Sequence, residues 1–202
     1  MVLAVEDILN AALRRVKYPT PIGSIYEGSR ASRIALDYYG QIRDAVLRER
    51  DWGFARQTVS LGAALKTAPA GGYGSTPWSA VNNPPLPWGY EYAYPMSCIM
   101  VRSVRPTPVA LPERNVFPNI FVVGSDTASG SLVVLTNLLN AQATITGRVT
   151  NPAAWNDAGF LDALIEALAV EFERQFAQEQ NPVQTADRDA EGATMIADMR
   201  RG

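Results

Sequence analysis

The chain changes character at Leu47-Arg48-Glu49-Arg50-Asp51-Trp52-Gly53-Phe54-Ala55-Arg56. Before this stretch, apolar residues recur every three or four positions, which is the spacing of one face of a helix. After it, from Gln57 onward, short apolar runs bounded by turn residues are typical of strands. Helices segregated from a block of strands predict an α+β fold, because alternating βαβ units would interleave the two patterns.

Three helices are predicted on the two sides of the strand block. The first carries the apolar positions Ile8, Leu9, Ala12, Leu13 and Val16. The second begins at a Ser-x-x-Glu capping box, Ser24 to Glu27, and runs to about Arg48. The third begins at Asn156 or Asp157 as the capping residue and extends to Gln178, which gives a helix of about 35 Å.

Strands are predicted between the second and third helices. They span residues 58–61, 90–94, 98–104, 117–123, 131–135 and 143–149 and favour a small antiparallel sheet or barrel. A loop rich in Gly, Pro, Ser and Asn, Ala68 to Pro87, interrupts them, and loops of this length are commonly functional. We therefore expect one domain over residues 1–180, with a helical body in 1–56 and 155–180 and a β region in 57–150, followed by a C-terminal arm at 181–202.

Composition removes most classes of enzyme site. The chain has no histidine, which is the usual general base and the commonest metal ligand. Its one cysteine, Cys98, lies in an apolar setting and is expected to be inert. The glycine-rich run Gly71 to Ser75 is followed by Thr-Pro-Trp rather than by the Lys-Ser/Thr of a phosphate-binding loop. We therefore expect no catalytic residue, no metal and no cofactor.

Charge and hydropathy indicate which partners the chain could meet. The 18 basic and 20 acidic residues give a net charge of −2, which offers no overall basic footprint for nucleic acid. No apolar run reaches the roughly 18 residues that span a membrane, and the first residues lack the pattern of a secretory signal. We expect a soluble protein without a membrane partner that touches DNA in passing at most.

Carboxylates on the third predicted helix are the residues that best fit an enzyme. Asp162 and Glu166 lie one helical turn apart and could act as an acid/base pair, which keeps a carboxylate-based hydrolase as an alternative. The solvated face of an amphipathic helix explains the same residues without a reaction.

Aromatic residues are the candidates for structural anchors and for interfaces. Trp52, Phe54 and Trp155 flank the junctions between helices and strands and are expected to anchor the fold. Tyr90, Tyr92 and Tyr94 share one face of a strand, which is consistent with a core layer or with a surface between subunits. The interface candidates are Trp88, Tyr90, Tyr92, Tyr94, Tyr73, Trp78, Met195, Ile196 and Met199.

Four pieces of the sequence, taken in order, resemble the head-to-tail adaptor family of tailed bacteriophages, which includes tail tubular protein A-like connectors. They are Ile8–Leu13, Val46–Ala55, Trp88–Pro95, and the opening Trp155-Asn156-Asp157 of an Ala- and Leu-rich helix that runs to Ala177. The resemblance implies a ring, usually of about twelve copies, that lies under the capsid portal and presents a docking surface to the tail tube or nozzle.

The same resemblance implies a structural part of the virion neck, assembled in the host cytoplasm, through which DNA passes during packaging and ejection. In such a ring the helices form the wall, the C-terminal arm orders against the portal, and the strand region with its loop meets the tail. A monomeric protein-binding module stays, beside the hydrolase, as an alternative.

Overall fold

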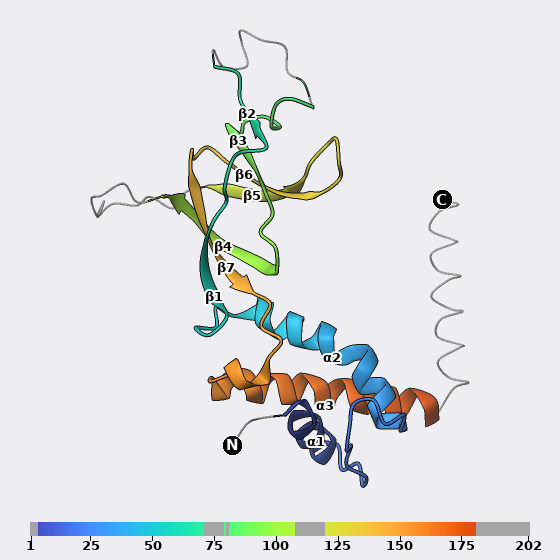
Figure 1. The fold of residues 1–202 in the computed structure, drawn as a ribbon. Helices are drawn as coiled ribbons and strands as arrows, with labels where there is room; N and C mark the ends of the chain where they lie inside the picture. Colours follow the sequence, from blue (N-terminus) through green and yellow to red (C-terminus); the bar gives the residue numbers. More distant parts are fainter. Residues whose placement is uncertain (1–3, 71–78, 80, 108–119, 181–202) are drawn as a thin grey trace, which may run out of the picture. The chain divides into compact units, whose positions relative to one another are not determined.

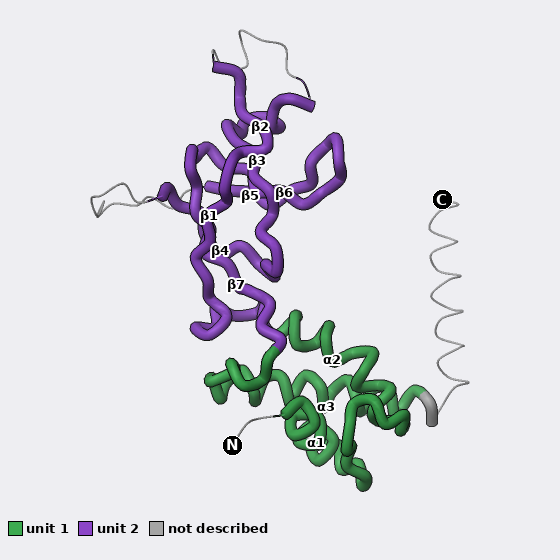
Figure 2. Tube along the Cα trace, in the orientation of Figure 1, with its two compact units in different colours: residues 1–46, 151–202 green, residues 47–150 purple. Residues whose placement is uncertain are grey.

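The computed structural model describes residues 4–70, 79, 81–107 and 120–180, and its helices and antiparallel strands form an α+β fold, as expected (Figure 1). The chain divides into two compact units. Unit 1 combines residues 1–46 with 151–202, and unit 2 is the continuous segment 47–150 (Figure 2). Unit 2 is thus an insertion in the sequence of unit 1. The division lies between Val46 and Leu47, whereas the sequence placed the β region from residue 57.

Unit 1 is built from helices α1 (Val5–Arg15), α2 (Arg30–Glu49) and α3 (Ala158–Gln180), although the last turn of α2 belongs to unit 2. A short 3₁₀ turn, η1 (Pro152–Ala154), precedes α3. α1 packs against α3. The buried side chains include Ile8, Leu9, Ala12 and Leu13 of α1 and Phe160, Leu164, Leu168 and Phe172 of α3. The apolar positions predicted for the first helix are therefore on the face that α1 buries, and α3 likewise buries one apolar face.

The start of α2 differs from the prediction. Ser24 and the residues up to Glu27 form a turn ahead of the helix, in which the Glu27 carboxylate accepts from the N–H groups of Gly23 at 2.7 Å and Ser24 at 3.1 Å. The helix begins after Ser29, whose Oγ accepts a hydrogen bond at 3.2 Å from the backbone N–H three residues further on. Gly28 separates the two turns with φ at 81°, so the helix cannot continue from the predicted capping box.

α3 begins where the sequence placed it. Asp157 is the capping residue, since its Oδ1 accepts hydrogen bonds from the N–H groups of Gly159 at 2.9 Å and Phe160 at 3.2 Å. The 23 residues of the helix give a length of about 35 Å. Of the two predicted caps, Asn156 and Asp157, the second therefore satisfies the free N–H groups of the first turn.

Unit 2 holds two antiparallel sheets rather than one. The first has the order β1-β7-β4, formed by β1 (Arg56–Ser60), β7 (Ala141–Gly147) and β4 (Cys98–Pro106). The second has the order β2-β3-β6-β5, formed by β2 (Lys66–Thr67), β3 (Tyr90–Ala93), β6 (Leu132–Thr136) and β5 (Phe121–Ser125). The sequence did not predict β2, because two residues carry no periodic pattern. Residues 117–119 of the strand predicted at 117–123 lie outside the described residues.

The core of unit 2 is made by the segment itself. One buried cluster consists of Leu61, Tyr92, Val101, Val104, Val134, Ala141, Ala143 and Ile145. The first and last strands, β1 and β7, pair from Arg56 opposite Thr146 to Ser60 opposite Gln142. The two ends of the inserted unit therefore leave the sheet side by side.

Candidate functional site

The tyrosine row at β3 lies in the core of unit 2. Tyr92 is 1% exposed, and its Oη donates a hydrogen bond to the Leu138 carbonyl at 2.9 Å. Tyr90 and Tyr94 pack against the same apolar cluster, and burial raises the pKa of Tyr92 and Tyr94. Cys98 also packs there, and burial raises the pKa of its thiol, which disfavours the reactive thiolate. The packing is that of a core layer, so Tyr92 offers no surface to another subunit.

The other interface candidates are placed in part. Trp88 is half-buried in the turn before β3, and its backbone N–H donates a hydrogen bond to the Pro85 carbonyl at 3.0 Å. The next residue, Gly89, donates its N–H to Asn137 Oδ1 at 2.6 Å, which ties this turn to the end of β6. The candidates Tyr73, Trp78, Met195, Ile196 and Met199 lie outside the residues that the structure describes.

The aromatic anchors are divided between the units. In unit 2, Trp52 is buried and Phe54 is half-buried, and the Arg50 guanidinium lies 5.8 Å from the centre of the Trp52 ring. In unit 1, Trp155 is buried, and its ring meets that of Phe160 edge-on with 5.2 Å between their centres. Trp155 therefore packs on the first turn of α3.

A residue that the sequence did not single out holds the end of α2. Arg102 extends from β4, and its Nη2 lies 2.6 Å from the carbonyl oxygen of Arg50, 2.8 Å from that of Arg48 and 3.3 Å from that of Leu47. Its Nε donates to Thr146 Oγ1 on β7 at 2.9 Å. A cation at the carbonyl end of a helix satisfies free acceptors and neutralises the negative end of the helix dipole. A single arginine on a strand carries no sequence pattern that indicates this role.

The carboxylates of α3 form surface ion pairs. Asp162 and Glu166 both contact the guanidinium of Arg15 on α1, with 3.6 Å between Arg15 Nη2 and Asp162 Oδ1. The two carboxylate side chains are 76% and 65% exposed, so water screens their charges. Neither residue occupies the apolar pocket that activates a catalytic carboxyl.

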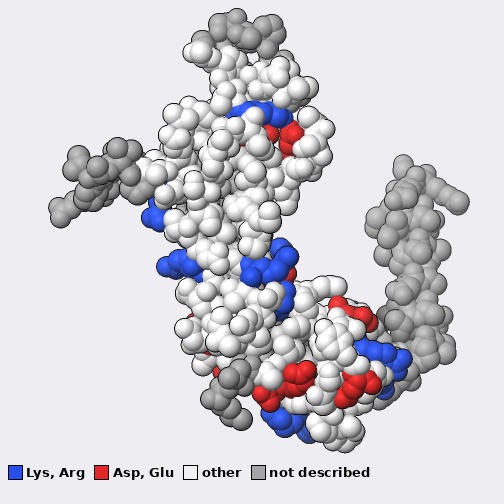
Figure 3. Space-filling model, viewed as in Figure 1, with Lys and Arg blue, Asp and Glu red and all other residues white. Residues whose placement is uncertain are grey.

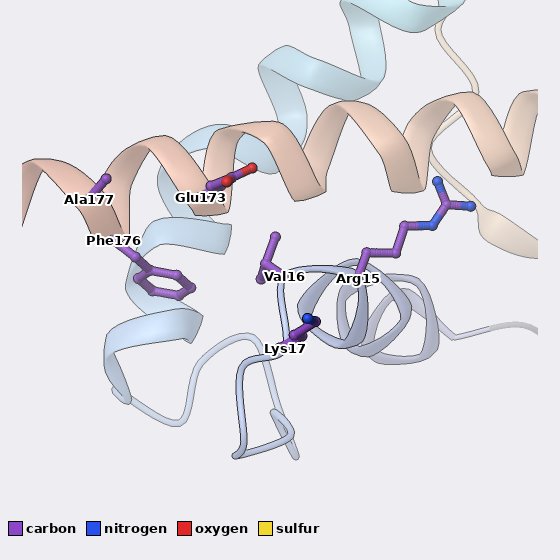
Figure 4. A pocket seen from close by; sticks show the side chains of 6 residues that line it. All are labelled: Arg15, Val16, Lys17, Glu173, Phe176 and Ala177. Atoms are coloured by element: carbon purple, nitrogen blue, oxygen red, sulfur yellow. The ribbon is translucent and has the colours of Figure 1, made fainter.

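An open hollow of about 420 Å³ lies between the end of α1 and the last turns of α3 (Figure 4). Arg15 and Lys17 line it from α1 and the turn that follows, and Glu173 and Phe176 line it from α3. The Phe176 ring stacks on that of Tyr18, with 4.7 Å between the ring centres. The hollow combines both signs of charge with an aromatic ring and is open to solvent, which suits a contact with another macromolecule better than an enclosed substrate.

Three buried charged residues lie together on the second sheet of unit 2. Nζ of Lys66, from β2, contacts Oδ1 of Asp126, the residue after β5, and lies 3.4 Å from Oε1 of Glu91 on β3. The side chains of Lys66, Glu91 and Asp126 are 9%, 1% and 10% exposed. Burial raises the pKa of Glu91, whereas hydrogen bonds from Lys66 and Ser129 hold that of Asp126 well below its usual range. Two carboxyl groups with different proton affinities thus share the same ammonium group.

The visible surfaces of the two units differ in charge. In the view of Figure 3, side chains of both signs are interspersed on unit 1, whereas most of the visible surface of unit 2 is uncharged. Within the described part of the chain, no three Asp, Glu, Cys or His side chains are grouped as metal ligands would be. None of the described helices is both long and apolar enough to cross a bilayer.

Comparison with known proteins gives no match: no protein-family model fits the chain, and no curated protein is similar enough to count as a relative.

Proposed function

We propose that this chain is a structural subunit of a head-to-tail adaptor in a tailed bacteriophage. Copies of the chain form a ring of about twelve subunits between the portal and the tail tube or nozzle, and DNA passes through the ring without specific binding. The main support is the ordered series Ile8–Leu13, Val46–Ala55, Trp88–Pro95 and Trp155–Ala177, which resembles the adaptor family over most of the chain.

The α+β architecture is compatible with this role. A ring subunit needs a body that packs side to side and surfaces that meet the components above and below it. In the proposed assembly the three helices form a bundle in the ring wall, and the two sheets close into a small barrel that faces the tail. The arm at residues 181–202 orders against the portal. The contacts between neighbouring copies are heterologous and close into a ring.

The distribution of charge also supports a conduit. The net charge is −2, and the charges visible on unit 1 in Figure 3 are of mixed sign, so the face of unit 1 seen there offers DNA no extended basic surface. The exposed ion pairs of Asp162 and Glu166 with Arg15 fit a surface role better than a hydrolytic one.

Electron microscopy of the purified protein, alone and mixed with a portal, tests the proposal. We expect ring-shaped particles, or rings that form only when the portal is present as a template. A particle that stays monomeric by light scattering and never joins a portal would count against the adaptor and favour a protein-binding module, for which the hollow of about 420 Å³ is the available contact site. Turnover of cell-wall substrates that disappears in Asp162→Asn or Glu166→Gln would favour the hydrolase.

Deletion of residues 185–202 separates folding from docking. We expect the shortened chain to retain its circular dichroism spectrum and thermal transition but to lose binding to the portal, because the removed segment follows α3 in the sequence and includes none of the described helices and strands. Portal binding at the level of the full chain would refute the role of the arm.

A further inference from the structure

We propose that Lys66 and Asp126 condense into an amide, a covalent cross-link between Lys66 Nζ and Asp126 Cγ, and that Glu91 moves the protons of this reaction. Such a cross-link lies wholly within unit 2 and is independent of the adaptor function. Its basis is the placement of three side chains: an amine in contact with one carboxyl, a second carboxyl beside the amine, and burial of all three.

The sheet brings the reacting groups together from its two outer strands. In the order β2-β3-β6-β5, Lys66 belongs to one edge strand and Asp126 follows the other. Lys66 and Glu91 are opposite each other across β2 and β3, so their side chains lie on the same face. Glu91 is in turn opposite Leu135 of β6, a buried leucine that makes this face apolar. The contact between Lys66 and Asp126 therefore connects the two edges of the sheet.

The turn after β5 holds Asp126 in one orientation. Its Oδ2 accepts hydrogen bonds from Ser129, from the backbone N–H at 3.0 Å and from Oγ at 2.7 Å. Its Oδ1 accepts a third hydrogen bond from the Ala128 N–H at 3.2 Å. These donors keep the carboxyl group against Lys66 and stabilise the negative charge that develops on its oxygens when an amine adds to Cγ.

Glu91 is placed to carry the proton. Its Oε1 lies 3.4 Å from Lys66 Nζ, so the Lys66 ammonium group is the donor that faces it. Because burial raises the pKa of Glu91, its carboxylate accepts a proton more readily than that of an exposed glutamate.

The reaction balances as the loss of one water. The Lys66 ammonium group gives a proton to Glu91, which passes it to the Asp126 carboxylate, and the neutral amine attacks Cγ of the resulting acid. The new N–C bond forms, and the bond from Cγ to the protonated oxygen breaks. That oxygen leaves as water with the proton it already carries and a second one that the nitrogen loses through Glu91. The amide nitrogen keeps one hydrogen, and no oxidant, reductant or further reactant is consumed.

Burial favours the product over the starting ion pair. Burial lowers the pKa of Lys66, but contact with Asp126 and Glu91 raises it by more. The neutral, reactive amine is therefore scarce, and the reaction is slow. An ion pair held out of water is costly, however, and condensation replaces the Lys66–Asp126 pair by one neutral amide and a released water molecule. The reaction also removes the ammonium partner of Glu91, whose raised pKa favours its neutral form. The reaction needs to occur only once in the life of each chain.

Mass spectrometry of the denatured, full-length protein tests the cross-link directly. We expect a chain lighter by one water than its sequence, after allowance for removal of Met1. We also expect a branched tryptic peptide that contains both Lys66 and Asp126, because trypsin does not cleave after an acylated lysine. A chain of full sequence mass overturns the proposal, and so does a missing water that maps to other residues while the Lys66 and Asp126 peptides are recovered separately.

Variants assign the roles within the cluster. Lys66→Arg removes the nucleophilic amine and Glu91→Gln removes the proton acceptor at almost constant size, so both variants are expected to retain the water that the parent loses. The matched control is Glu171→Gln, which removes a carboxylate that pairs with Arg174 on α3 and should lose water to the parental extent. Cross-linking of Glu91→Gln at the parental yield would refute proton transfer by Glu91. Only a variant with the parental circular dichroism spectrum assigns a role, because an unfolded chain does not bring Lys66 to Asp126 and keeps the water for that reason.

Discussion

Arg102 satisfies carbonyl groups that the end of a helix leaves without donors. It binds three carbonyls in and just beyond the last turn of α2 and one threonine of β7, from a strand 52 to 55 residues further along the chain. Hydrogen bonds from a charged donor are stronger than those between neutral groups, and this side chain is half-buried. Arg102 therefore connects a helix end to a sheet inside unit 2.

We expect Arg102→Met to lower the free energy of unfolding by about 2–3 kcal/mol, because it leaves several carbonyls without a donor while keeping most of the side-chain volume. Urea denaturation of the full chain measures the change. Arg105→Met is the matched control on the same strand. The Arg105 side chain is exposed and, among the described residues, donates one hydrogen bond, to Thr58 Oγ1 at 3.3 Å, so its loss should cost below about 0.5 kcal/mol. Equal effects of the two substitutions would contradict the role of Arg102.

Tyr39 is a buried residue of α2 whose hydroxyl makes no hydrogen bond within the described residues. Burial raises its pKa to about 12. The unfolded chain loses this proton near pH 10, so the stability due to the protonated form is complete below about pH 10 and is lost as the pH rises toward 12.

Tyr39→Phe should remove this alkaline loss and leave stability at pH 7 unchanged or higher by up to about 1 kcal/mol, because an unsatisfied buried hydroxyl is removed. Thermal unfolding at pH 7 and between pH 10 and 12 measures both effects. Tyr26→Phe, at an exposed tyrosine, is the control and should follow the parent at every pH. Greater destabilisation by Tyr39→Phe than by Tyr26→Phe at pH 7 would show that the Tyr39 hydroxyl has a partner.

At the scale of single elements, the stability of α3 depends on the hydrogen bonds that cap its first turn. Asp157→Ala removes the acceptor for two N–H groups and should cost about 1 kcal/mol of unfolding free energy, whereas Asn156→Ala should cost little because Asp157 accepts both hydrogen bonds. Chemical denaturation of the two variants, compared at the same pH, makes the measurement. A larger loss of unfolding free energy from Asn156→Ala would mean that Asn156, rather than Asp157, caps the helix.

The helices and strands could be predicted to a large extent, because burying one face imposes a period on the sequence. The spacing from Ile8 to Leu13 indicates α1, and the alternation at β3 indicates a strand. Their ends were harder to predict: the box at Ser24 has the composition of a cap, but Gly28 takes a positive φ after it and moves the start of α2 to Arg30. The alternation of side chains along β3 predicts that Tyr90, Tyr92 and Tyr94 share one face, but it does not predict that this face lies in the core.

The residues that hold unit 2 together could not be predicted from local patterns. Lys66 and Asp126 are 60 residues apart and belong to opposite edges of a sheet, so their contact follows from strand order rather than from spacing. Glu91 lies between Tyr90 and Tyr92 on β3. The alternation of side chains along a strand predicts that it faces away from these tyrosines, but not what it contacts there. The contacts of Arg102 likewise follow from strand order rather than from spacing in the sequence, because they depend on the position of β4 beside β7.

At the scale of the whole molecule, the chain is a helical unit interrupted by a complete β unit. The buried cluster of unit 2 extends from Leu61 to Ile145, and the pairing of β1 with β7 brings the two ends of the unit together. A segment with its own core and neighbouring ends has the properties of an inserted domain.

We therefore expect residues 47–150, expressed alone, to fold with a β-rich circular dichroism spectrum and a cooperative thermal transition. Val134→Asp in the same fragment is the control, because it places a charge at a position with no exposure and should abolish the transition. A fragment that melts without cooperativity would mean that unit 2 requires unit 1 to fold.

The pairing of β1 with β7 also determines how unit 2 responds to mechanical load. Tension that pulls Leu47 and Thr150 apart acts on one end of an antiparallel ladder, where the Gly147 N–H donates to the Ala55 carbonyl at 2.8 Å. The hydrogen bonds of such a ladder lie across the strands, so this tension breaks them one after another rather than all at once. Stretching should peel β1 from the sheet at low force while β7 stays paired with β4, and the rest of unit 2 yields only afterwards.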